Sequence, residues 1–489
     1  MDFALATLFL ILYYVRPHEW LEWMASVQPI TKVLAVGLAV VLYQVGRRVH
    51  WHPRRFLGEF LRTPLDWILL AFTLWVLHAA ADWKATWSLF YPSLGYYVLV
   101  QHALSTVRRI ESFLWVWLGL LLFIATMAVL SEYNVDTFNS LGYTQGMYKG
   151  RLTLNLSIFN NPNALGHSVA MILPMIFFLG IWHRFLLGME LSLPLYIMPV
   201  WCLLRTESKG AFVSSAAGLL TTQACGRPRW VQIALLLVTY ALGMSALMLL
   251  PRMNQLGSVR GDRAVQGRLL SWNFGWESFK TLPKGLGYGE FINRAPVYVE
   301  GKYRMRKPAH SSYVEVGAEL GKSGLFLWLG ILYYSLKSLL RSRGRNDQEE
   351  RIRRLLVCLV VIYMVSSWLT NISYRGSFFI QTAVIAALCR LRQRRPQPDP
   401  ALNGSAAAAA DGDADSEIRA SGLAPLGGLP TAGTPDSAET VEPVADEGPS
   451  SWLTWRRLVA FLVDMALIYV MYLLVIRAWL YFMLDWKGV

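Results

Sequence analysis

The sequence predicts an all-α protein, a polytopic bundle of transmembrane helices. Hydrophobic residues make up 54% of its 489 residues and charged residues only 16%, whereas soluble domains carry about a quarter charged residues. Apolar runs of roughly 17 or more residues, long enough to cross a hydrocarbon core of about 30 Å, recur along the chain. Helices are the expected spanning structure, because lipid offers backbone N–H and C=O groups no partner.

We expect about twelve spans in the core of the bundle and one more near the C-terminus. The first segment has neither a basic start nor a small-residue cleavage site, so we interpret it as a retained helix. The expected spans lie near residues 3–15, 30–46, 64–80, 88–104, 110–130, 164–182, 192–204, 209–223, 230–250, 323–340, 354–369, 374–390 and 458–476.

Basic loops predict the orientation of these spans. The basic segments 47–62, 341–354 and 390–395 alternate with basic-poor loops, and all fall on one side if the N-terminus is cytoplasmic. Two sizeable extracytoplasmic loops then remain, at residues 131–163 and 251–322.

Three domains follow from composition. Residues 1–395 form the polytopic membrane domain. Residues 396–450 are rich in Ala, Pro, Gly, Ser and acidic residues and contain almost no large apolar side chain. Such a segment cannot bury enough surface to offset its ordering entropy, so we interpret it as a disordered cytoplasmic linker. Residues 451–489 are expected to form a C-terminal transmembrane helix.

The loop 251–322 departs from the rule that basic residues gather in the cytoplasmic loops. It carries twelve lysines and arginines against six aspartates and glutamates, within a chain of formal net charge +14. Long loops can be translocated regardless of charge, so topology does not explain this excess. It is either a solvated, topologically neutral loop or a surface that handles anions.

The stretch that follows Pro308 carries the strongest candidate for chemistry. Ser312 and Glu315 have the spacing of a capping box, which would place His310 and Ser311 just before a helix N-terminus. Free backbone N–H groups and the helix dipole favour an anion there, and a histidine exchanges protons near neutral pH. The alternative for His310 is an ordinary surface histidine at a helix start.

His310-Ser311, nine further residues, then Gly321 and Gly324 resemble the histidine motif of the O-antigen ligase family. That family is related to the O-antigen polymerases and to some bacterial protein O-oligosaccharyltransferases. Glu315 and the pattern Glu319-Leu320-Gly321 are also similar to this superfamily.

Three upstream segments extend the resemblance, which covers roughly residues 60–390. Arg268 lies in a segment similar to the family's arginine-bearing amphipathic segment, and the glycine-rich turn 283–289 follows it. Arg151 precedes a Pro-Asn pair in which Asn163 is expected to cap a helix; the alternative for Arg151 is contact with a lipid headgroup. In the segment from Arg205 to Lys209, Lys209 stands where the family usually has arginine. Lysine lacks the planar guanidinium group that can form two parallel hydrogen bonds with a phosphate.

The resemblance implies a glycosyltransferase of the C type, working in the bacterial inner membrane with its active face extracytoplasmic. It implies transfer of a glycan from a polyprenyl-diphosphate carrier to the hydroxyl of an acceptor lipid, glycan or protein, with no cofactor, metal or nucleic acid. His310 and Arg268 would be catalytic, with His310 either accepting the hydroxyl proton or orienting the diphosphate. The diphosphate would be bound by Arg151, Arg205 and Lys209, and the supporting residues would be Ser311, Glu315, Gly321 and Gly324.

The sequence is also compatible with other functions. An O-antigen or exopolysaccharide polymerase would use the same chemistry on a second carrier-linked glycan. A non-catalytic transporter of an anionic lipid or glycan would also place arginines at membrane depth. A membrane scaffold would need neither His310 nor Arg268. Ligase, polymerase and protein O-oligosaccharyltransferase are not distinguished, and neither are the glycan, the acceptor, the oligomeric state or the role of the C-terminal helix.

Overall fold

The computed structural model of the chain describes residues 1–27, 29–182, 185–225, 263–300, 303–341, 343–394 and 455–487, with a few single positions from 227 to 237. The chain divides into two compact units, one of Met1–Arg392 with Leu467–Val489 and the other of Gln393–Ala466. The linker predicted for residues 396–450 lies wholly outside the described residues, and the span predicted for 230–250 lies largely outside them.

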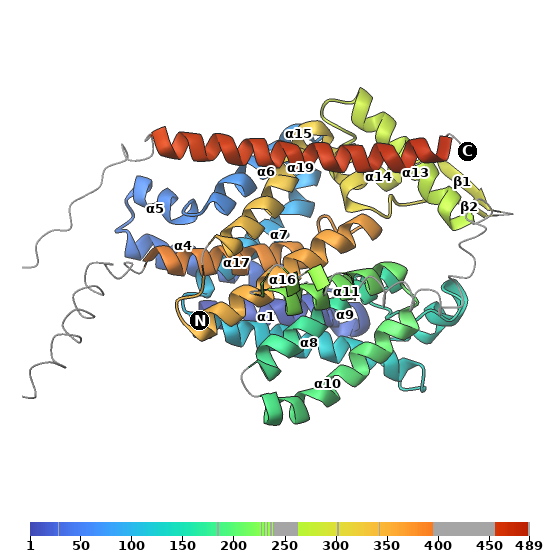
Figure 1. The fold of residues 1–489 in the computed structure, drawn as a ribbon, viewed down its shortest axis with the longest axis horizontal. Coiled ribbons are helices and arrows are strands. Elements are labelled where there is room, and N and C mark those ends of the chain that lie inside the picture. The colour runs from blue at the N-terminus through green and yellow to red at the C-terminus, as the bar shows by residue number, and fades with distance from the viewer. Residues whose placement is uncertain are drawn as a thin grey trace, which may run out of the picture. The chain divides into compact units, whose positions relative to one another are not determined.

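Helices dominate the described part of the chain (Figure 1). One antiparallel hairpin, β1 (Val297–Glu300) and β2 (Tyr303–Arg306), is the exception to the predicted all-α class, which is otherwise confirmed. The helices are α1 (Asp2–Val15), α2 (Pro17–Trp20), α3 (Glu22–Ala25), α4 (Pro29–Arg48), α5 (Pro53–Phe60), α6 (Pro64–Ala79), α7 (Trp83–Ala103), α8 (Val107–Ser131), η1 (Tyr143–Met147), α9 (Pro162–Ile176), η2 (Phe177–Ile181), α10 (Phe185–Thr206), α11 (Lys209–Ala224), α13 (Arg263–Thr281), α14 (Phe291–Arg294), α15 (Ser312–Leu340), α16 (Asp347–Leu369), α17 (Gly376–Arg394) and α19 (Trp455–Lys487).

Six of the described helical segments are long and apolar enough to cross a membrane. They are Pro29–Arg48, Val107–Ser131, Pro162–Ile181, Ser312–Leu340, Asp347–Leu369 and Val459–Tyr481, and α5 with α6 would add a seventh if that pair, bent by 94°, were one span. This is fewer than the predicted count, partly because helices such as α1 and α11 are short. The figure of about twelve core spans therefore stays a prediction.

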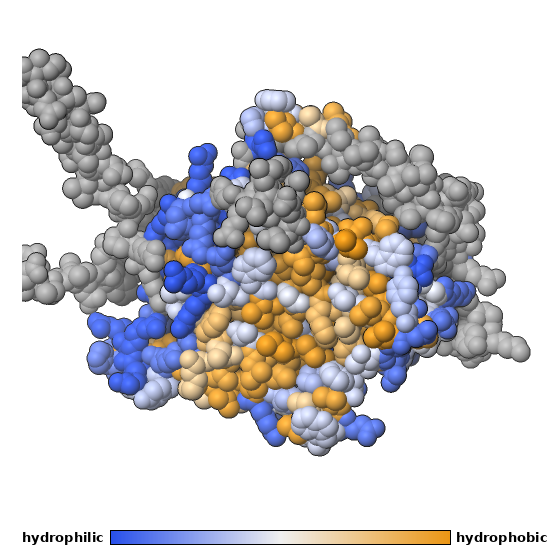
Figure 2. All heavy atoms as spheres, turned by 90° about the horizontal axis from the view of Figure 1, so that it is seen from below, coloured by the Kyte–Doolittle hydropathy of each residue, from blue (hydrophilic) through white to orange (hydrophobic). Residues whose placement is uncertain are grey.

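A broad apolar surface accompanies these helices. Figure 2 shows hydrophobic side chains across the middle of one face, with hydrophilic side chains gathered on either side of them. Large apolar residues that a soluble protein would bury are exposed here, among them Leu74, Leu89 and Ile197. An apolar belt between polar margins is the surface expected of a protein solvated by lipid.

Polar residues define where the helices begin. Thr63 and Asp66 form a reciprocal capping box at the start of α6, which satisfies backbone donors that the helix leaves unpaired. Asp66 also accepts from the hydroxyl of Tyr97 at 2.7 Å and from Arg390 at 3.2 Å. The start of α6 is therefore held to α7 and to the end of α17.

Polar contacts between distant segments fall into two sets. The first joins Asp2 with Arg109, Glu111 with Arg351, Asp66 with Arg390, Trp182 with Asp347, and the Cys225 carbonyl with Arg354. The second joins Glu19 with Ser157, Glu132 with Arg205, the Ile158 carbonyl with Arg375, Tyr13 with Gly376, and Ser312 with the Thr370 carbonyl. The basic-loop rule assigns the segments of the first set to one side and those of the second to the other. Which side faces the cytoplasm stays a prediction.

Candidate active site

The start of α15 is anchored by Ser312. The N-cap is Ser311, whose side chain makes no capping hydrogen bond. Ser312 Oγ donates to the carbonyl of Thr370 at 2.9 Å and accepts from the N–H of Ile372 at 2.9 Å. The predicted capping box between Ser312 and Glu315 is therefore wrong, because the Ser312 hydroxyl is used by the connection between α16 and α17.

Glu315 serves the same connection. Its carboxylate accepts from Asn371 Nδ2 at 2.6 Å and from the hydroxyl of Ser373. Two residues later Arg375 donates from Nη1 to the carbonyl of Ile158 at 2.6 Å, and burial lowers the pKa of this guanidinium. Arg375 was not predicted as a site residue. It links the loop before α9 to the beginning of α17.

His310 lies on the loop that α13 holds in place. Trp272 Nε1 donates to the carbonyl of Ala309 at 2.6 Å, and Ser271 Oγ donates to the carbonyl of Lys307 at 3.1 Å. Arg268 stands three and four positions before these two residues, so it lies on the same face of α13. His310 itself has a left-handed backbone with φ 52°, a conformation that costs a non-glycine residue energy unless the surroundings impose it.

Three cations lie close enough to His310 to act electrostatically on its imidazole. Its pKa is lowered to about 3, first by burial and then by the positive charges of Arg268, Lys307 and Arg151. The structure thus brings His310, Arg268 and Arg151 together from three separate segments. Lys307 was not predicted as a site residue, although it belongs to the run of basic residues before the motif. At neutral pH the free site holds a neutral imidazole among positive charges, which is an environment for an anion.

Arg151 is held by the turn between α10 and α11. It donates from Nε to the carbonyl of Thr206 at 3.1 Å and from Nη2 to Asn163 Oδ1 at 3.1 Å. Ser208 Oγ donates to the same oxygen at 2.8 Å. The cap of α9 is Asn161, which accepts from the N–H of Asn163. The predicted capping role of Asn163 is therefore wrong, since its side-chain oxygen accepts hydrogen bonds from Arg151 and Ser208 instead.

The two other predicted diphosphate ligands lie at this turn and are exposed. Arg205 pairs with Glu132 in a forked contact, with Nη2 2.7 Å from Oε1 and Nε 2.9 Å from Oε2. Lys209 is the first residue of α11, directly after the N-cap Ser208. The side chain of Arg205 is thus already paired with a carboxylate. Its backbone carbonyl accepts from the N–H of Leu152 at 2.9 Å, which connects this turn to the residue after Arg151.

Gly321 interrupts α15. Its φ of 65° and ψ of −164° are not helical, and this break leaves the carbonyls of residues 318–320 without their usual helical donors. The N–H groups of Leu286 and Gly287 donate to the first two carbonyls at 2.9 Å each. The indole of Trp75 donates to the third at 2.8 Å. The glycine-rich turn therefore completes the broken helix that follows His310.

Close packing at this junction explains two of the glycines. A Cβ on Gly285 would lie 2.4 Å from the backbone carbon of Glu319, and one on Gly321 would lie 2.3 Å from the carbonyl oxygen of Pro283. Both have positive φ, which adds strain for any larger residue. Gly324 is also crowded, with the indole of Trp75 3.1 Å from an added Cβ. These glycines support the site through the backbone and not through side-chain chemistry.

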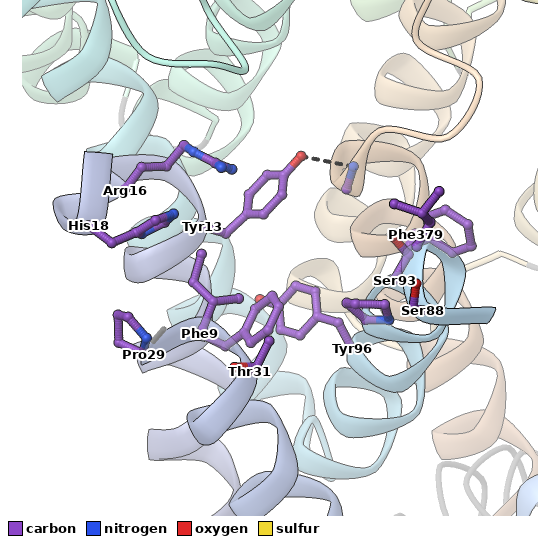
Figure 3. Close-up of a pocket in the computed structure, with 14 residues that line it drawn as sticks. Phe9, Tyr13, Arg16, His18, Pro29, Thr31, Ser88, Ser93, Tyr96 and Phe379 are labelled. Atoms are coloured by element: carbon purple, nitrogen blue, oxygen red, sulfur yellow. Dashed lines mark hydrogen bonds between the residues drawn. The ribbon is translucent and has the colours of Figure 1, made fainter. Parts of the chain in front are cut away.

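A pocket of about 610 Å³ lies elsewhere in the bundle, between α1, α4, α7 and α17. Figure 3 shows the aromatic rings of Phe9, Tyr13 and Tyr96 directed into it, with Tyr13 Oη accepting from the N–H of Gly376 at 2.9 Å. The residues that line it include none of the predicted site residues. The candidate active site is therefore defined by the cationic cluster at His310 and not by this pocket.

Comparison with known proteins gives one family. The family model described as O-Antigen ligase matches residues 194–329. The matched segment contains Arg268, Lys307 and His310, together with the glycine-rich turn, while Arg151 precedes it. No curated protein matches the chain.

Proposed function

We propose that the chain, whose residues 194–329 match the O-antigen ligase family model, is an O-antigen ligase-like glycosyltransferase. It moves a glycan from a polyprenyl-diphosphate carrier to an acceptor hydroxyl on the extracytoplasmic face of the bacterial inner membrane. The observation that carries this proposal is the cluster of Arg151, Arg268 and Lys307 around the half-buried imidazole of His310.

The cations suit the leaving group of such a transfer. A diphosphate gains negative charge as its bond to the sugar breaks, and guanidinium groups stabilise that charge by paired, charge-assisted hydrogen bonds. Arg268 and Arg151 are held for this task by α13 and by the α10–α11 turn. Lys307 adds a point charge. Lys209 is exposed at the edge of the same turn and assists. Arg205, engaged by Glu132, mainly positions this turn.

The low pKa of His310 supports its role as the base. The acceptor hydroxyl oxygen attacks the anomeric carbon, the bond from that carbon to the diphosphate oxygen breaks, and the diphosphate leaves with the electron pair. His310 takes the hydroxyl proton. A bound diphosphate offsets the three positive charges and raises the pKa of His310, so that the imidazole can retain the proton. One displacement of this kind inverts the anomeric configuration.

Ser311 and the break at Gly321 shape the surroundings of the base. The hydroxyl of Ser311 is buried beside His310 and no protein group in the described part of the chain bonds it, which leaves it available to a bound substrate. Glu315 holds the start of α15, and the break at Gly321 lets the glycine-rich turn close against it. These residues position His310 and do not take part in bond exchange.

The test is replacement of His310 by Ala in cells, with measurement of both the outer-surface polysaccharide and the carrier-linked glycan. We expect loss of the product and accumulation of carrier-linked glycan on the outer face. Accumulation on the inner face would instead indicate a transporter. An unchanged product would overturn the proposal.

His50 offers a matched control. It is an exposed histidine that also has a left-handed backbone, with φ 50°. His50→Ala therefore reproduces the backbone change of His310→Ala without touching the cationic cluster. It should leave the product at the level of the unmodified protein.

A further inference from the structure

The C-terminal helix α19 lies outside the matched family segment, yet part of it is buried against α15. From Leu467 onward six of its described large apolar residues are exposed, while Ile468 and Trp479 are fully buried and Val475 is nearly so. With Tyr472, which meets Phe326 at a ring distance of 6.3 Å, these positions recur every three or four residues. They form one stripe on the helix, as in helix packing and not as in a simple lipid anchor.

The stripe runs antiparallel to α15. Ile468 lies near Gly330, with its Cδ1 3.6 Å from an added Cβ there, whereas Trp479 lies near Gly317, with its Cζ3 3.2 Å from an added Cβ. The contacts therefore progress along α15 toward its N-terminus, which His310 precedes.

At the C-terminal end of this stripe, Trp479 also contacts α13. Its ring lies 5.2 Å from that of Trp276 and 5.5 Å from that of Phe279. Gly275 and Gly317, one on each helix, leave room for the indole, whose nearest atoms lie 3.4 Å and 3.2 Å from an added Cβ. Trp479 is thus seated between α13 and α15.

The residues that Trp479 contacts share a face of α13 with the active-site residues. Arg268, Trp272, Trp276 and Phe279 follow one another at helical spacing. The first faces His310, the second binds the Ala309 carbonyl, and the last two contact Trp479. A shift of α13 at its far end would therefore be transmitted to Arg268.

We propose that Trp479 is a positioning residue for the transfer reaction, and that the second half of α19 locks α13 against α15 so that Arg268 stays beside His310. This inference rests on the proposed function. It assigns a role to a helix that the family match does not include.

The first experiment uses Trp479→Ala, Trp479→Phe and Leu474→Ala in the full-length protein. Phenylalanine keeps an aromatic ring in the seat although it is smaller than the indole, and the indole N–H that it removes makes no hydrogen bond to the described residues. Leu474 is on the same helix and 61% exposed. We expect the Ala variant at 479 to lower kcat/KM about tenfold or more, and the other two to stay within about threefold. Equal activity of all three would overturn the proposal.

The pH profile separates positioning from general destabilisation. Withdrawal of Arg268 and entry of water both favour the imidazolium form, even with Lys307 and Arg151 still facing His310, so the pKa of His310 rises in Trp479→Ala. Its activity should fall at pH 5 to 6 relative to pH 8 more than that of the unmodified protein. A loss that is uniform across pH would overturn the proposal.

A second pair of variants tests the seat itself. Gly317→Ala inserts a Cβ against the indole of Trp479. The same Cβ would lie 3.3 Å from Cδ2 of Phe279. Transfer should fall in Gly317→Ala and recover at least in part when Trp479→Phe is added. A double variant that is no better than Gly317→Ala alone would count against the lock.

Hydrogen exchange distinguishes failure of this inference from failure of the proposed function. In the full-length protein in detergent, Trp479→Ala should speed exchange in residues 263–281 and 307–310, and Leu474→Ala should not. Unchanged exchange would overturn the lock whether or not transfer is observed. Faster exchange in a protein that shows no transfer would leave the lock standing and remove the proposed function.

Discussion

Trp272 and Ala309 are joined by a hydrogen bond of 2.6 Å from the indole Nε1 to the backbone carbonyl, although 37 residues separate them. This bond connects the helix that carries Arg268 to the residue before His310. His310 and one of the cations that act on it are therefore held by neighbouring elements of one small assembly. Their separation does not depend on the long loop between them.

Trp272→Phe should weaken this connection while keeping the ring. The carbonyl of Ala309, a fully buried residue, would lose its indole donor, which costs about 1–3 kcal/mol in stability of the local structure. We expect kcat/KM to fall about tenfold, measured with carrier-linked glycan in detergent. Trp67→Phe, at a position 50% exposed on α6, is the control and should have little effect.

The pH dependence should differ between kcat/KM and kcat. The free site has His310 with a pKa of about 3, so kcat/KM should stay flat as the pH falls from 8 to 5 and should not drop near 6.5. Bound diphosphate raises this pKa, so kcat should fall at a higher pH than kcat/KM does. A common midpoint near 6.5 in both profiles would contradict the role assigned to the cations.

Lys307→Gln tests the sign of the electrostatic effect. Removing one of the positive charges that face His310 makes the imidazolium easier to form and raises its pKa. The acidic limb of kcat/KM should therefore move toward neutral pH, and Lys307→Arg should keep it low. A shift to still lower pH would be incompatible with a cationic surrounding.

Gly285→Ala and Gly289→Ala separate the cost of backbone strain from the cost of a steric clash with α15. Both glycines have φ of 75°, but an added Cβ meets Glu319 at 2.4 Å only at Gly285 and meets nothing within 4 Å at Gly289. We expect Gly289→Ala to cost about 1 kcal/mol in stability and Gly285→Ala several times more, by thermal unfolding in detergent. Equal costs would argue against the close approach of the turn to α15.

Arginine-to-lysine changes should separate Arg151 from Arg205. Arg151 uses two different nitrogens to bind Thr206 and Asn163, a geometry that an ammonium group cannot reproduce. Arg205 is exposed, and an exposed ion pair such as that with Glu132 contributes only about 0.2–1 kcal/mol. Arg151→Lys should therefore reduce kcat/KM roughly tenfold or more, and Arg205→Lys by a few-fold at most. The reverse order would restore Arg205 as a direct ligand of the diphosphate.

Local patterns anticipated some elements well and misread others. Glycine positions such as Gly321 could be recognised because a motif is contiguous in sequence. The capping roles assigned to Ser312 and Asn163 failed because both side chains have partners from distant segments, Thr370 and Arg151. Lys307 left no distinctive local signal, since it lies in a run of basic residues. Arg375 is the only charged residue between Arg354 and Arg390, and an isolated charge in an apolar stretch is the signal that could have found it.

By itself the sequence determined a helical fold with apolar segments suited to a membrane, and a histidine motif that resembles that of the O-antigen ligases. Apolar content and short motifs are properties of neighbouring residues, so they can be read without coordinates. Only the tertiary structure decided that Arg151, Arg268 and Lys307 face one imidazole, that a glycine-rich turn completes the broken α15, and that Trp479 seats between α13 and α15. Each of these depends on contacts between residues distant in the chain, which packing and hydrogen bonding select and sequence spacing does not encode.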